Sequence, residues 1–188
     1  PYNTFEASYR LFQTVEYWPE GTTFVSVVDP GVGSSRKSVV ALTKTGQYIV
    51  TPDNGTLSYI KKVVGIVAVR EISEVENRRS NTELSYTFHG RDVYAYTGAK
   101  LASGHISFEE VGPELPVDKI LELPVVETII EDNLVRGAID ILDVRFGSLW
   151  TSITRDDFYA LEPNFGDRFE VTIFNNDMLV YQNQVTYG

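Results

Sequence analysis

Three short loops of the sequence combine small residues with side chains that can bind or activate a small molecule. The first is Asp29–Arg36, in which a carboxylate and a guanidinium enclose two glycines; the others are Pro52–Gly55 and Phe88–Asp92, which contains His89. Such groups can hold a water molecule together. The carboxylate accepts its proton, the imidazole accepts or donates, and the guanidinium favours the deprotonated form of its neighbours. These residue types therefore suit activation of a nucleophile without a metal.

Each of these residues also has an ordinary structural interpretation. Asp before Pro is common in turns, so Asp29-Pro30-Gly31 can simply end a strand. Arg36 can form a surface ion pair, and a single histidine such as His89 is more often structural than catalytic. Asp53-Asn54-Gly55 is by default a turn, and Gly31-Val32-Gly33 is not a phosphate loop because no Gly-Lys-Ser/Thr follows it. The residues alone indicate a small-molecule site of undefined chemistry.

The elements around the first loop predict an α/β layer. Thr23–Val28 is apolar and β-branched, which predicts a buried strand that ends at Asp29. Ligands in open α/β sheets bind just past the carboxyl ends of strands, so Asp29 and Arg36 lie where sites usually form. Other predicted elements are a helix from Asn3 or Thr4, strands at Ser38–Thr43, Gln47–Thr51 and Gly65–Arg70, a short helix at Leu57–Val64, and a helix from Val93 to Leu101 with Asp92 as its cap.

Two connecting segments precede a change in the sequence pattern at about residue 125. Glu71–Ser85 is polar and predicts a surface connection, and Phe108–Pro124 contains three prolines and predicts a linker. Short alternating strands follow at 136–143, 148–154, 168–174 and 178–186, the last two joined by the turn Asn175–Asp177. We therefore predict an α/β domain at residues 1–124, with a mixed sheet and flanking helices, and a small all-β, barrel-like domain at residues 125–188.

Composition excludes several classes of function. Acidic residues outnumber basic ones 26 to 16, for a net charge of −10, which argues against nucleic acid and anionic membranes as partners. The chain has no cysteine, so disulfides and thiolate chemistry are excluded, and its two histidines are too few for a His-rich metal site. No apolar run approaches the ~20 residues of a membrane span, and no signal peptide is visible. We expect a soluble, cytoplasmic protein.

Four motifs occur in order along the chain and are specific in combination. They are Val27–Gly33 with Arg36, then Pro52–Gly55, Phe88–Asp92 and Ile141–Gly147. Together they resemble the S-adenosyl-L-methionine hydroxide adenosyltransferase family, which is related to the fluorinase and chlorinase that attack the same substrate with halide. The resemblance covers the whole chain, although each motif alone is weak.

The resemblance implies a fold, an assembly and a reaction. Family members have an N-terminal α/β domain and a C-terminal β-barrel-like domain. They form homotrimers, with active sites between the N-terminal domain of one subunit and the C-terminal domain of its neighbour. They convert S-adenosyl-L-methionine and water to adenosine and L-methionine. The resemblance therefore implies a hydrolase that needs neither cofactor nor metal.

The family's site residues fall on particular positions of this chain. Its water-activating triad falls on Asp29, Arg36 and His89. A sulfonium substrate has a good neutral leaving group, so the site must supply a well-aimed, poorly solvated nucleophile. The expected substrate-binding residues are the aromatic walls Tyr2, Phe88 and Phe146, the carboxylate Asp143 for the methionine amino group, and Asn54 and Ser148.

The chain departs from the family pattern, and other functions compete. Ser148 stands where the family usually has an Asn that contacts adenine, and no Asp-containing segment precedes Pro1. We expect a fragment, with an N-terminal domain that lacks its first segment and an incomplete C-terminal domain. The alternatives are a non-catalytic binder of S-adenosylmethionine or adenosine, a structural trimer module with no ligand, in which Asp29, Arg36 and His89 lie apart from one another, and a halogenase. The last is disfavoured because Asp29 stands where the fluorinase has a tyrosine.

Overall fold

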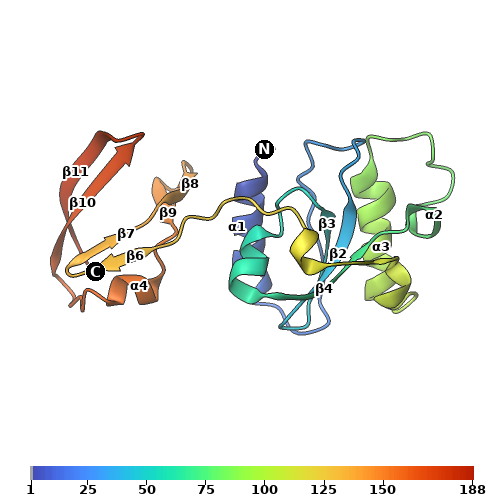
Figure 1. Ribbon diagram of the computed structural model, residues 1–188, viewed down its shortest axis with the longest axis horizontal. Helices are drawn as coiled ribbons and strands as arrows, with labels where there is room; N and C mark the ends of the chain where they lie inside the picture. The colour runs from blue at the N-terminus through green and yellow to red at the C-terminus, as the bar shows by residue number, and fades with distance from the viewer. Residues whose placement is uncertain (1) are drawn as a thin grey trace. The chain divides into compact units, whose positions relative to one another are not determined.

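The computed structural model describes residues 2–188, and the chain divides into two compact units, one ending at Val125 and the other spanning Val126–Gly188 (Figure 1). The first unit contains a mixed sheet with strand order β1-β3-β2-β4-β5. Only β1 and β3 run parallel, and the other neighbours are antiparallel. The strands are β1 (Thr23–Val25), β2 (Ser38–Thr43), β3 (Tyr48–Pro52), β4 (Ile66–Glu71) and β5 (Glu114–Leu115).

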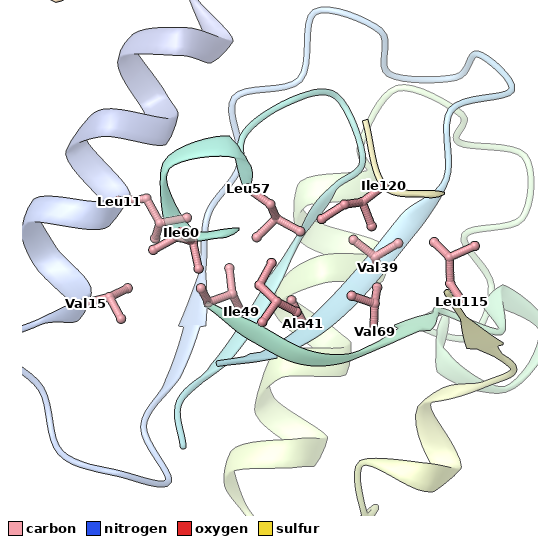
Figure 2. Packing of buried hydrophobic residues seen from close by; sticks show 11 residues of the cluster. Leu11, Val15, Val39, Ala41, Ile49, Leu57, Ile60, Val69, Leu115 and Ile120 are labelled. Atoms are coloured by element: carbon pink, nitrogen blue, oxygen red, sulfur yellow. The ribbon is translucent and has the colours of Figure 1, made fainter. Parts of the chain in front are cut away.

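The central strand β2 explains why the sheet is covered on both faces. Successive side chains of a strand point to opposite faces. Val39 and Ala41 accordingly lie in one buried cluster, and Val40 lies in another. Figure 2 shows the first cluster, in which residues of α1 (Thr4–Val15) and of the helical segment before β4 meet the sheet. The second cluster joins Val40 to the helical segment that follows His89. The predicted mixed α/β layer is confirmed.

Most of the predicted elements of this unit form where the sequence places them. Asn3 caps α1 by accepting hydrogen bonds from the backbone of Phe5 and Glu6, at 3.0 and 3.2 Å. The β2–β3 hairpin turns at Gly46, whose φ of +83° suits glycine. The other helical segments are the π-helices η1 (Ile60–Val64) and η2 (Gly90–Ala95), the α-helices α2 (Glu74–Asn77) and α3 (Tyr96–Ala102), and the 3-10 turns η3 (Glu109–Val111) and η4 (Val117–Lys119).

Two predictions about the segments beside the loops were wrong. The strand before Asp29 ends at Val25 and is half-buried, because β1 is an edge strand with β3 as its neighbour in the sheet. The helix after His89 begins at Gly90, so Asp92 lies inside it and is not its cap. The buried Asp92 carboxylate instead accepts two hydrogen bonds from Arg91, at 2.7 and 2.9 Å.

The two predicted connections also prove to be structured. The proline-rich segment Phe108–Pro124 supplies β5 to the sheet edge, and its Leu115 and Ile120 lie in the core. The polar segment Glu71–Ser85 contains α2, and its Asn77 is fully buried, where its side chain donates to Val111 O at 2.9 Å. The composition of the two segments did not predict these contacts, because only a few side chains of each segment are buried.

The second unit consists of three hairpins and one helical turn. The paired strands are β6 (Ile129–Glu131) with β7 (Leu134–Arg136), β8 (Ile139–Asp143) with β9 (Ser148–Thr151), and β10 (Arg168–Asn175) with β11 (Met178–Thr186). The helical turn is α4 (Arg155–Tyr159), capped by Thr154. The turn between β10 and β11 has positive φ at Asn176 and Asp177, as the predicted hairpin requires.

Two details of this unit differ from the predictions. The strand predicted at 136–143 is shorter, since β8 covers Ile139–Asp143 and Arg136 is the last residue of β7, which pairs with β6. The three hairpins form three separate two-stranded sheets across residues 126–188, so the described residues contain an all-β unit but not a closed barrel.

In residues 2–188, none of the helices has the length and apolar character needed to cross a bilayer.

Candidate active site

Asp29 and Arg36 form a buried, bidentate ion pair. Arg36 donates from Nε to Asp29 Oδ1 at 2.9 Å and from Nη2 to Asp29 Oδ2. The two side chains are only 5% and 10% exposed, respectively. A bidentate arrangement, with two parallel N–H···O hydrogen bonds, is the strongest that a guanidinium and a carboxylate form. The alternative of a surface ion pair is therefore wrong.

Tyr94 and Ser38 close a ring of hydrogen bonds around this ion pair. Arg36 Nη1 donates to Ser38 Oγ at 3.1 Å, and Ser38 Oγ lies 3.1 Å from the hydroxyl of Tyr94. The Tyr94 hydroxyl in turn donates to Asp29 Oδ2 at 3.5 Å. Burial raises the pKa of Tyr94 well above its usual value, so the hydroxyl keeps its proton and can donate. The ring fixes the direction of the Asp29 carboxylate.

His89 is held between two guanidinium groups. Its Nδ1 lies 3.1 Å from Arg36 Nη2, and its Nε2 lies 3.0 Å from Arg78 Nη2. Arg78 also pairs through Nη2 with Glu74, four residues earlier in the chain. The ring is 6% exposed. The structure thus brings Asp29 and Arg36, from the loop after β1, into one cluster with His89, from a second loop.

The surroundings of His89 favour the neutral form of its ring. Burial lowers the pKa of His89 below its ordinary value, and the positive charges of Arg36 and Arg78 lower it further, against the opposing effects of Glu74 and Asp29. A neutral imidazole offers one nitrogen lone pair and one N–H. At neutral pH the ring therefore has one nitrogen that can accept a hydrogen bond and one that can donate.

Close backbone packing holds the loops of the cluster together. Gly33 has a φ of +80°, and a Cβ there would stand 3.1 Å from the carbonyl oxygen of Tyr86. A Cβ at Gly90 would stand 3.3 Å from the side chain of Val27, so the helix start packs tightly against the chain that leads to Asp29. Glycine at these two positions lets the segments on either side of the site approach each other.

Asn54, expected to bind substrate, is engaged with the protein itself. Its Nδ2 donates to Val28 O at 2.9 Å, and its Oδ1 accepts from the hydroxyl of Thr56 at 2.6 Å. Asn54 therefore ties the end of β3 to the chain just before Asp29. The acid beside it, Asp53, accepts a hydrogen bond from the backbone of Leu121 at 2.8 Å, and burial raises its pKa.

The remaining expected residues are more exposed. In the first unit, Tyr2 and Phe88 are 77% and 54% exposed, and the guanidinium of Arg91 lies over the Phe88 ring at 4.9 Å. In the second unit, Asp143 and Ser148 face each other across the β8–β9 hairpin, and Phe146 lies in its turn with 83% exposure. The structure therefore assembles the triad within one unit and presents the aromatic residues at surfaces.

Sequence reasoning missed the partners that surround the triad. They are Ser38, Glu74, Arg78 and Tyr94. Arg78 and Glu74 carried no signal, since they lie in a segment that resembles a solvated connection. In the part of the chain that the structure describes, no group of three or more His, Asp or Glu side chains is arranged to hold a metal ion.

Comparison with known proteins assigns the chain to a family. Residues 1–112 match the model described as the SAM hydroxide adenosyltransferase N-terminal domain, and the chain belongs to this family. The chain is 36% identical over 157 residues to a protein of Methanocaldococcus jannaschii named (R)-S-adenosyl-L-methionine hydrolase, covering 84% of this chain and 52% of the relative. A protein of the same name from Thermus thermophilus is also 36% identical, over 82% of this chain and 60% of the relative.

The chain is also similar to a fluorinase and to a protein of known structure. A fluorinase from Actinopolyspora mzabensis is 26% identical over 92% of this chain and 64% of its own length. A crystal structure of a conserved protein from Thermotoga maritima matches 99% of this chain and 67% of that one, with a TM-score of 0.87 and 34% identity. The chain thus spans between half and two thirds of the length of these relatives.

Proposed function

We propose that this chain provides the catalytic unit of an S-adenosyl-L-methionine hydrolase that releases adenosine and L-methionine. The observation that carries the proposal is the buried cluster of Asp29, Arg36 and His89, with contacts of 2.9 and 3.1 Å through the guanidinium. The family match and the names of the two hydrolase relatives, each 36% identical, support the same reaction.

The proposed reaction is an attack of water at C5′ of the substrate. The water oxygen forms a bond to C5′ while the C5′–S bond breaks. The electron pair of the C5′–S bond stays on sulfur, so the sulfonium becomes the neutral thioether of methionine. The proton leaves the water for the acceptor groups of Asp29 or His89 and then for solvent. A closed site contributes by aiming the water and removing competing solvent. The residues supply partial hydroxide character without a metal or a cofactor.

The other site residues have proposed roles in substrate binding. The exposed aromatic side chains of Tyr2, Phe88 and Phe146 suit the walls of a pocket for adenine and a cationic sulfur. Asp143 would meet the methionine amino group, with Ser148 near the adenine. Asn54 would act through the loop that it holds.

The assembly that we propose follows the resemblance described above. The protein would be a cytoplasmic homotrimer with its sites at subunit interfaces, and its C-terminal unit would complete a barrel-like domain there. Its substrate would be a small molecule, with neither nucleic acid nor membrane as partner. The net charge of −10 favours a cationic substrate over either of these anionic partners.

Incubation with S-adenosylmethionine in ¹⁸O-labelled water tests the proposed reaction. We expect adenosine and methionine in equal amounts, with the label in the 5′ hydroxyl group. His89→Ala should abolish most of the turnover, and His105→Ala, at an exposed histidine, is the matched control. Substrate binding without turnover in the unsubstituted protein would support a non-catalytic binder and overturn the proposal.

A halide arm of the same experiment separates the halogenase alternative. Chloride or fluoride is added to the reaction, and 5′-halo-5′-deoxyadenosine is sought by mass spectrometry. We expect none, because the buried Asp29 carboxylate, 5% exposed, repels an anionic nucleophile. Halogenated product in place of adenosine would assign the chain to the halogenase reaction instead.

A further inference from the structure

Arg78 is a buried arginine that uses only part of its guanidinium group. Its side chain is 10% exposed, and Nη2 contacts both Glu74 and His89. Its Nη1 is buried and has no hydrogen-bond partner among residues 2–188. A buried donor without a partner costs free energy. The position of Arg78 is therefore poorly explained as a device for stability alone.

The contacts of His89 cannot both be hydrogen bonds. A guanidinium only donates, and a neutral imidazole has a single acceptor nitrogen. Of the contacts to Arg36 and Arg78, at 3.1 and 3.0 Å, one at most is a hydrogen bond in the neutral ring. In the charged ring neither is, because both nitrogens carry hydrogens that point at cations. The two guanidinium groups therefore disfavour protonation of His89 from both edges.

Each edge of the ring also has a carboxylate behind its guanidinium. Arg36 holds Asp29 on the Nδ1 side, and Arg78 holds Glu74 on the Nε2 side. The carboxylates raise the pKa of His89 against the arginines, and Glu74 has the largest effect of the four charges. Asp29 and Arg36 come from the loop after β1, Glu74 from α2, and Arg78 directly follows α2. Tyr94, on the helical segment that follows His89, adds no charge because burial keeps its hydroxyl protonated.

We propose that Arg78, held by Glu74, is a positioning residue that fixes the Nε2 edge of His89 and keeps the ring in its neutral form for the reaction. The proposal rests on the proposed hydrolase function for its catalytic meaning. It extends the site to α2, which none of the four sequence motifs includes. The pair acts through His89, on the edge opposite the one that faces Asp29 and Arg36.

The two members of the pair have opposite charges, so their removal has opposite consequences. Arg78→Met removes a positive charge beside Nε2 and should raise the pKa of His89. Glu74→Gln removes a negative charge while keeping the shape of the side chain, and should lower that pKa. Damage to the fold would not produce shifts of opposite sign. The matched controls are Arg79→Met and Glu76→Gln, at exposed positions on the same segment.

The first experiment is an NMR titration of His89 in the full 188-residue chain, with His105→Gln used to assign the imidazole signals. We expect the midpoint to move to higher pH in Arg78→Met, to lower pH in Glu74→Gln, and not to move in the two controls. Midpoints that stay in place, or that move in the same direction in both variants, overturn the proposal. This measurement needs no substrate, so its result stands whether or not the hydrolase function holds.

The second experiment is the pH dependence of kcat/KM for S-adenosylmethionine hydrolysis. The acidic limb of the profile should move in the same directions as the NMR midpoints. Arg78→Lys keeps the charge but loses the planar group, so its limb should stay in place while kcat falls on the order of 10-fold. A limb that ignores these substitutions while the NMR midpoints move would show that Arg78 sets the charge of His89 without serving the reaction.

Discussion

The two sets of expected site residues differ in how completely their own unit organises them. Asp29, Arg36 and His89 are buried, and each has partners at hydrogen-bond distance. In the second unit, Phe146 lies in the turn of the β8–β9 hairpin and is 83% exposed. The first set is held by contacts within its own unit. The second offers exposed aromatic area that a bound molecule would cover.

Under the proposed function, this difference separates the residues for the chemistry from those for recognition of the substrate. Activating a water requires fixed distances and fixed charges, which a buried network supplies at little cost during the reaction. Recognising an adenine or a methionine tail requires apolar area that becomes covered on binding. We therefore expect substitutions in the buried cluster to affect kcat and stability, and substitutions in the hairpin to affect KM with little effect on folding.

Asp29 is the position where the comparison predicts the largest effect. Asp29→Asn should lower kcat on the order of 10²-fold or more, because the amide cannot take the proton of the water. The measurement is adenosine release at saturating S-adenosylmethionine. Asp132→Asn, at an exposed acid of the second unit, should leave the rate unchanged. Equal rates in both variants would remove Asp29 from the mechanism.

Asp29→Ala should in addition destabilise the first unit. It leaves the Arg36 guanidinium, 10% exposed, without its carboxylate, and breaking a buried pair of this kind costs about 3–5 kcal/mol. Urea unfolding at neutral pH measures the loss. A change within about 0.5 kcal/mol of the unsubstituted protein would mean that the cluster is less rigid than its contacts indicate.

Arg36→Lys should have the next largest effect. Lysine keeps the charge but cannot reach Asp29 with two parallel N–H groups and also contact Ser38 and His89. We expect kcat to fall on the order of 10-fold or more. The neighbouring swap Lys37→Arg is the control, since Lys37 pairs with Glu71 outside the cluster. An Arg36→Lys protein as active as the control would show that only the charge of Arg36 matters.

Much of the fold was predictable because local patterns and tertiary structure agree in it. The cap at Asn3, the hairpin at Gly46 and the turn at Asn176 follow from residues whose backbone preferences act within a few positions. The errors at Phe108–Pro124 and Glu71–Ser85 arose where a few buried side chains, such as Leu115, override a polar or proline-rich composition. Such contacts are long-range and leave no local pattern.

The candidate site was predictable only as far as its motifs extend. Asp29, Arg36 and His89 stand in Gly-containing loops, and their meeting in one cluster is consistent with the family resemblance. Arg78 and Tyr94 complete the cluster but carry no motif. Arg78 reaches His89 because α2 folds against the first unit, and the partners of a buried charge are set by that packing rather than by spacing in the sequence.

The pH dependence of stability tests the environment of His89 in the buried cluster without a change to Asp29 or Arg36. The folded-state pKa of His89 is lowered, so between that value and the ordinary 6.5 the unfolded chain binds a proton that the folded chain does not. Stability should therefore fall as pH drops below 6.5 and level off below the folded-state pKa. Urea unfolding of His89→Gln across the same range should lack this contribution. An identical pH dependence in both proteins would mean that His89 is not protected from protonation.

Phe146→Ala should have the smallest effect on folding and defines the other side of the comparison. The side chain is 83% exposed in the β8–β9 turn, so its loss should change the free energy of unfolding by less than about 0.5 kcal/mol. KM for S-adenosylmethionine should nevertheless rise several-fold with kcat nearly unchanged, because an aromatic wall contributes to binding rather than to activation of the water. Tyr181→Ala, at a half-exposed aromatic of β11, controls for a general loss of apolar surface. If Phe146→Ala instead lowers kcat with KM unchanged, the hairpin takes part in the chemistry, and the separation between a buried catalytic cluster and an exposed recognition surface fails.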